Sequence, residues 1–148
     1  GMGRPDHAPS KRLIHNLLEL MQEGNADFTN TFRHLSDTLR KGKRSARKQF
    51  QDPATFDLWE KRWIEQIKQE PVSMDTCANQ MDQINPAYIP RNHKVEEVLS
   101  AAINNSDFKL FENMLALLAT PFDEGKGHEE FAMPAPVSSV PYKTFCGT

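Results

Sequence analysis

Cysteine is scarce in this sequence, since only Cys77 and Cys146 occur among 148 residues. Two cysteines cannot form a disulfide framework or, by themselves, a zinc site. Long apolar stretches are missing too, because no run reaches the roughly 18 residues of a transmembrane helix and the first residues hold no apolar segment of a signal peptide. These absences predict a soluble, cytoplasmic protein in a reducing environment, without a membrane partner.

The alternation of apolar and polar residues that marks β-strands is also missing, whereas apolar residues recur at helical spacing in six segments. Residues that could cap helices precede several of these segments, at Ser10, Asp27, Asp52 and Ser73. The apolar stripes are predicted to be buried and lie within residues 13–21, 28–39, 56–67, 74–84, 95–103 and 108–118. We predict an all-α fold, an irregular bundle of about six amphipathic helices with an extended C-terminal tail.

Length and composition favour a single domain with one core, because 148 residues with 38% hydrophobic and 26% charged side chains are typical of a globular chain. Gly1 before Met2 resembles the remnant of a cleaved tag, so residues 1–9 are predicted to be a remnant and leader. Residues 10–121 are predicted to form the helical domain. Residues 122–148, rich in proline, glycine and serine, are predicted to form the extended tail.

Residue patterns of known catalytic and metal sites are missing as well. The five histidines form no H-x-x-x-H pair, and neither a G-x-S-x-G motif nor a complete phosphate-binding loop occurs, although Gly-Lys-Gly stands at 125–127. His15 and Glu19 share a helical face and are expected to be a surface pair. Trp59 and Trp63 are interpreted as core residues rather than a ligand platform. We therefore predict no catalytic residue, metal ligand or cofactor in this chain.

Positive charge is concentrated in one segment, because residues 40–48, RKGKRSARK, hold six lysines and arginines. Such a run could bind the phosphates of a nucleic acid. It has no aromatic residue that would stack on a base, and the net charge of the whole chain is −2. We interpret the run as a solvated linker between helices and do not expect nucleic acid as a partner.

The segment INPAYIPRN, residues 84–92, separates two predicted helices and holds Asn85, Pro86, Tyr88, Arg91 and Asn92. Pro86 disfavours helical geometry in the residue before it, and Asn92 or a neighbour can cap the next helix. In order with ADFTNTFRHLSD (26–37), WEKRW (59–63), SDFKLFENMLALLATPFDE (106–124) and the terminal CGT, this turn resembles the C-terminal end of the selenoprotein O (YdiU) family. The resemblance covers nearly all of the chain.

The resemblance implies a parent pseudokinase that binds ATP with Mg²⁺ or Mn²⁺ and transfers AMP to protein hydroxyls. This chain lacks the glycine-rich loop, the lysine motif, H-R-D and D-F-G of a kinase-like fold. It is therefore expected to be a non-catalytic structural and regulatory domain, with the kinase-like N-terminal half as its partner. The resemblance also implies that Cys146 is a redox-active regulatory residue. The alternative is a free-standing helical module that binds protein or nucleic acid.

Overall fold

The computed structural model describes residues 8–40, 44–125 and 127–136, which contain helices and no strand. The predicted all-α class is thus confirmed. None of the helices in these ranges is both long and apolar enough to cross a lipid bilayer. Composition predicts one core over residues 10–121, whereas the chain divides into two compact units between Pro86 and Ala87, each with a hydrophobic core of its own.

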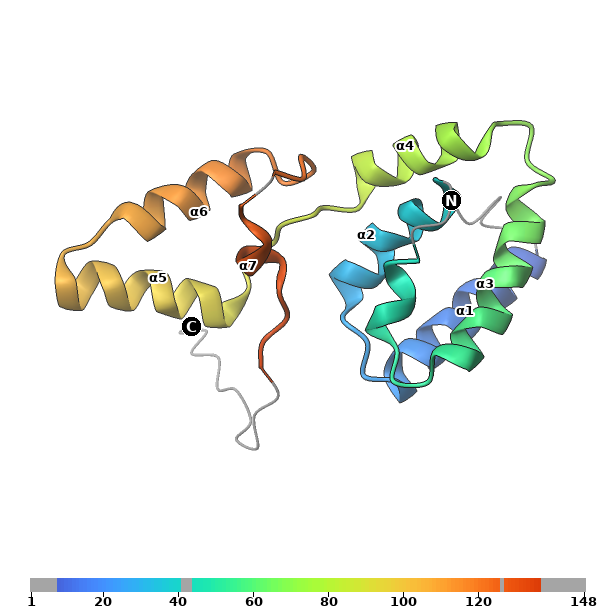
Figure 1. The fold of residues 1–148 in the computed structure, drawn as a ribbon, viewed down its shortest axis with the longest axis horizontal. Coiled ribbons are helices and arrows are strands. Elements are labelled where there is room, and N and C mark those ends of the chain that lie inside the picture. Colours follow the sequence, from blue (N-terminus) through green and yellow to red (C-terminus); the bar gives the residue numbers. More distant parts are fainter. Residues whose placement is uncertain (1–7, 41–43, 126, 137–148) are drawn as a thin grey trace. The chain divides into compact units, whose positions relative to one another are not determined.

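Unit 1 extends to Pro86. In Figure 1, α1 lies beside α3, and the contacts of α2 are with α4 and the short 3₁₀ helix η1. Three predicted N-caps are confirmed, because side-chain oxygens of Asp27, Asp52 and Ser73 accept backbone N–H groups in the first turns that follow. The elements are α1 (Ala8–Glu23), α2 (Phe28–Leu39), η1 (Ala46–Gln49), α3 (Pro53–Ile67) and α4 (Met74–Ile84).

The predicted cap at Ser10 is wrong, because α1 already begins at Ala8. Ser10 is fully buried, and Gln66 Nε2 of α3 donates a hydrogen bond of 2.6 Å to its hydroxyl oxygen. A second bond joins the same two helices, from Trp59 Nε1 to the carbonyl of Leu13 at 2.9 Å. Ser10 therefore helps to fasten α1 to α3 instead of starting a helix.

The core of unit 1 is formed by the apolar stripes of its helices. Trp59 and Trp63 are buried and their rings stack with centroids 5.6 Å apart, which confirms that they are core residues. Burial of each large apolar side chain contributes about 1.5–3 kcal/mol. The other buried apolar members are Leu13, Leu17, Met21, Leu35, Leu39, Ala46, Phe50, Phe56, Ile67, Cys77, Ala78 and Met81.

Unit 2 begins at Ala87 and contains α5 (Asn92–Asn105), α6 (Lys109–Ala119) and the short α7 (Glu129–Ala132) in its described part. Figure 1 shows α5 and α6 as an antiparallel hairpin. The helix α7 lies within the region predicted as an extended tail, and its Phe131 is buried against the hairpin. The core is small, with Ala87, Tyr88, Val98, Met114 and Phe131 as its buried members.

The predicted burial of the apolar stripes is wrong for much of unit 2. Val98 is the only buried residue of α5, and Met114 the only one of α6. Ile103 is 78% exposed and Leu115 is 54% exposed. The three helices in the described part of this unit leave one side of the hairpin without a neighbouring helix, so apolar side chains there are exposed.

Candidate functional site

The signature turn at residues 84–92 begins with Asn85, which is fastened to α2. The N–H of Asn85 caps α4 by donating to the carbonyl of Met81 at 2.8 Å. Its side-chain Nδ2 donates to the carbonyl of Phe32 at 3.2 Å, and its own carbonyl accepts Nη1 of Arg33 at 3.0 Å. Pro86 follows outside the helix, as predicted from the bias of residues before proline. The side chain and the backbone of Asn85 thus both position the start of the turn.

Tyr88 fixes the part of the turn that belongs to unit 2. Its side chain is buried, and its hydroxyl donates to the carbonyl of Gly125 at 3.1 Å. The N–H groups of Ala87 and Tyr88 both donate to the carbonyl of Pro121, at 2.7 and 3.2 Å. Gly125, considered above as part of a phosphate-loop fragment, thus has a structural contact here, because its carbonyl accepts the hydroxyl of Tyr88.

Arg91, rather than Asn92, is the N-cap of α5, and it acts through its backbone. Its carbonyl accepts the N–H groups of Lys94 and Val95, each at 2.9 Å, while no side-chain cap bond is present. Asn92 is the first helical residue. The prediction that Asn92 or a neighbour caps this helix is not confirmed, because Arg91 precedes the helix without a side-chain cap bond.

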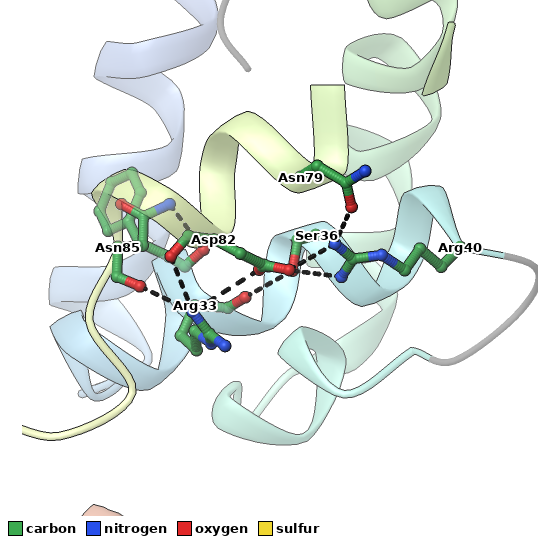
Figure 2. A network of polar contacts seen from close by, with 7 residues as sticks. Arg33, Ser36, Arg40, Asn79, Asp82 and Asn85 are labelled. Atoms are coloured by element: carbon green, nitrogen blue, oxygen red, sulfur yellow. Dashed lines mark hydrogen bonds and ion pairs between the residues drawn. The ribbon is translucent and has the colours of Figure 1, made fainter. Parts of the chain in front are cut away.

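A network of polar side chains joins α2 to α4 next to the turn (Figure 2). Asp82 is at its centre: its carboxylate accepts Ser36 Oγ at 2.5 Å and forms an ion pair with Arg40. Arg40 also donates to Oδ1 of Asn79 at 2.9 Å. The Nη1 of Arg33 lies 3.8 Å from the Asp82 carboxylate and donates to the backbone carbonyls of Asp82 and Asn85, both at 3.0 Å.

Arg33 completes the C-terminal end of α4. The last carbonyls of a helix have no partner within the helix, and they carry a partial negative charge. The Arg33 guanidinium, with a side chain only 8% exposed, supplies both the missing donors and the opposite charge. The signal for this network in the sequence is the polar stripe of Arg33, Ser36 and Arg40 at positions i, i+3 and i+7 of one helix, which we did not single out.

In the described part of the basic run 40–48, Arg44 and Arg47 are still partly solvated, with side chains 43% and 38% exposed, but they also form ion pairs that were not predicted. Arg44 donates to Glu60 Oε2 at 2.5 Å and to Asp57 Oδ1 at 2.5 Å, and Arg47 Nε donates to Asp57 Oδ1 at 2.8 Å. Glu60 is buried although it is charged, which requires such a partner. Hydrogen bonding to Glu60 raises the pKa of Arg44, and bonds from Arg47 and then Arg44 lower the pKa of Asp57.

We expect the double variant Arg44→Gln, Arg47→Gln to destabilise unit 1 by about 1–2 kcal/mol, because it removes the cationic partner of the buried Glu60 carboxylate and leaves it the hydroxyl of Thr38. Urea denaturation followed by tryptophan fluorescence measures this. Lys48→Gln, at an exposed position of the same run, is the matched control and should have no effect. The pKa of Asp57 is lower in the folded chain than in the unfolded chain, so the ion pairs of its carboxylate stabilise the fold at pH values above the pKa of the unfolded state. This stabilisation is lost as the pH falls through the pKa of Asp57 in the folded state. Unchanged stability of the double variant would show that the ion pairs of Arg44 and Arg47 do not stabilise unit 1, as expected for a linker.

The remaining candidate residues do not converge on a site. His15 and Glu19 form the expected surface pair, with 3.2 Å between Nε2 and Oε1. Cys77 is buried, and Cys146 lies outside the described residues. Within the described ranges, no three His, Cys, Asp or Glu side chains are close enough to hold a metal ion.

Comparison with known sequences identifies relatives over nearly the whole chain. The family described as protein adenylyltransferase SelO matches residues 1–119. A protein from Geobacillus kaustophilus is 43% identical over 138 residues, and one from Bradyrhizobium diazoefficiens is 41% identical over 137 residues. Both bear the name protein nucleotidyltransferase YdiU; the matches cover 93% and 92% of this chain but only 28% of each relative's length. The chain therefore belongs to the SelO (YdiU) family of nucleotidyltransferases.

Proposed function

We propose that this chain is the C-terminal helical domain of a SelO-like pseudokinase that transfers AMP from ATP to protein hydroxyls. Its role is structural and regulatory, and its partner is the kinase-like remainder of that protein. The observation that carries the proposal is the family match over residues 1–119 together with the 28% share of the relatives' length. ATP and its divalent metal bind to the remainder, and the protein acts in the cytoplasm.

Two features support a role without catalysis for this part of the protein. The sequence lacks the motifs by which kinase-like folds hold phosphates and metal ions. The polar network of α2 and α4 has its charges directed at each other, with Asp82 shared by Arg40 and Arg33. Positioned metal and phosphate ligands are what AMP transfer requires, so their source is the remainder of the protein.

In this proposal, Cys146 is the residue through which the domain regulates activity. The resemblance to the family is its support, and its role as a redox-active residue stays a prediction. The alternative of a free-standing nucleic-acid-binding module is not favoured, because family membership accounts for the chain. In addition, Arg44 and Arg47 are already paired with Asp57 and Glu60.

The isolated chain should neither bind ATP nor label proteins with AMP, because it lacks the phosphate and metal ligands. Isothermal titration with ATP and Mg²⁺, and with ATP and Mn²⁺, measures the first property, and transfer of labelled AMP measures the second. The full-length relative from Geobacillus kaustophilus is the comparison protein. Saturable ATP binding with protein labelling by the chain alone would contradict the non-catalytic role. A relative that keeps its stability and transfer rate after deletion of its matching segment would contradict the supporting role.

A further inference from the structure

Unit 2 exposes apolar side chains on both helices of its hairpin. Leu99 and Ile103 on α5 are 44% and 78% exposed, and Phe111 and Leu115 on α6 are 38% and 54% exposed. We call these four residues the open face. Within each helix the two residues are four positions apart, so they lie one above the other along the helix.

The two exposed pairs lie on the same side of the hairpin. Leu99 follows the buried Val98 by one position, and Leu115 follows the buried Met114 by one position. One position turns the side chain by about 100° around the axis, in the same rotational sense along each chain. The helices α5 and α6 run antiparallel (Figure 1), so, viewed along their axes, they are related approximately as mirror images across the core between them. A turn of about 100° away from the buried residue therefore directs the exposed pair of each helix to the same side of the hairpin. The open face is therefore a single apolar surface formed by two helices.

The opposite side of α5 is already covered. Lys94 donates to Glu97 at 2.9 Å and to Glu130 at 3.2 Å, and its ammonium lies 5.7 Å from the centre of the Phe131 ring. Nine positions separate Lys94 from Ile103, which corresponds to a rotation of roughly 900° around the helix axis, or two and a half turns. The two side chains therefore lie on opposite sides of α5. The short helix α7 thus covers the side of α5 that is turned away from Ile103, and no described helix of unit 2 covers the open face in the same way.

We propose that the open face is the surface by which this domain docks on the kinase-like remainder of the family protein, an inference that rests on the proposed function. The matched relatives contain a large additional part, since the chain spans 28% of their length. Clustered apolar side chains of this kind are typical of interaction surfaces. The chemistry of the partner is accordingly an apolar patch on a segment of the same protein.

The size of the open face favours a tethered partner over a second copy of the chain. A helix of 14 residues is about 21 Å long and two helices side by side are about 20 Å wide, which gives roughly 400 Å². A stable complex of separate chains buries about 800 Å² on each partner. A covalent link supplies a high effective concentration, so a smaller area is sufficient between domains of one protein.

The test compares thiol labelling of Ile103→Cys in two proteins, the 148-residue chain and a chimera in which this chain replaces the matching segment of the Geobacillus kaustophilus relative. Both carry Cys146→Ser, and peptide mass spectrometry identifies the labelled site. Labelling should be rapid in the chain and at least about tenfold slower in the chimera, because the docked thiol reacts only after opening. Asn104→Cys, at the next position on α5 and also exposed, is the matched control and should react at the same rate in both proteins.

Equal labelling rates of Ile103→Cys in chain and chimera would overturn the proposal. Slow labelling in the chain that becomes fast after removal of residues 137–148 would assign the face to that segment. Slow labelling that rises with dilution, together with a dimeric mass, would assign it to a second copy. A chimera that transfers AMP with an unprotected Ile103→Cys would leave the proposed function intact and remove only the docking surface. A chimera that transfers no AMP even without the Ile103→Cys substitution would contradict both the proposed function and the docking surface.

Discussion

Arg33→Met is expected to destabilise unit 1 by about 3 kcal/mol, since breaking a buried ion pair and leaving its acceptors unpaired is costly. The variant keeps the length of the side chain but removes the donors from the carbonyls of Asp82 and Asn85. It also removes one of the two arginines near the Asp82 carboxylate, which keeps its contacts with Ser36 and Arg40.

The measurement is urea denaturation of the 148-residue chain followed by tryptophan fluorescence. Both tryptophans of the sequence, Trp59 and Trp63, belong to unit 1, so the signal reports on that unit alone. The midpoint should fall with an unchanged slope. Arg62→Met, at an exposed position of α3, is the control and should change the free energy of unfolding by no more than about 0.5 kcal/mol. Equal midpoints for Arg33→Met and the control would show that the polar network does not stabilise the fold.

Tyr88→Ala is expected to unfold unit 2 while unit 1 remains folded. Truncation of a large buried aromatic residue costs about 3–5 kcal/mol. The described part of unit 2 has five buried apolar residues in its core, of which Tyr88 is one, so little stability remains after its loss. Circular dichroism at 222 nm should therefore lose the contribution of α5 and α6.

Tryptophan fluorescence of Tyr88→Ala should retain the native spectrum of unit 1. Tyr88→Phe is the matched control, because it keeps the ring and removes the hydroxyl with its bond to the Gly125 carbonyl, at a cost of about 0.5–1.5 kcal/mol. Loss of the native fluorescence in Tyr88→Ala would show that the two units unfold as one. Full retention of helical signal would show that the turn residue is not a core residue of unit 2.

The local features of the sequence predicted much of the fold. Asp52 followed by Pro53, and the caps at Asp27 and Ser73, predicted helix starts because a cap acts within a few residues. Trp59 and Trp63 were placed in the core because helical spacing directs them to one face. These predictions hold because their causes are local.

The features that were missed depend on partners distant in the chain. Helical spacing marks Ile103 as apolar, but whether it is buried depends on what lies against α5, and in the structure it is 78% exposed. The Arg44 side chain is solvated, as its charge predicts, but its pairing with Glu60, sixteen positions away, was not predicted. The candidate turn was found by resemblance, whereas its attachment to α2 through Arg33 requires knowledge of which helices are neighbours.

The sequence separation within the polar network has a consequence for the protein during its synthesis. The acceptors for the Arg33 side chain stand 49 and 52 positions later, and the carboxylate for Ser36 stands 46 positions later. At the usual rates of protein synthesis, about 5–20 residues per second, roughly 2–10 s pass between the synthesis of α2 and that of α4. During that interval the acceptors that Arg33 and Ser36 use in the folded unit do not yet exist, so the polar network can form only after α4 has been synthesised.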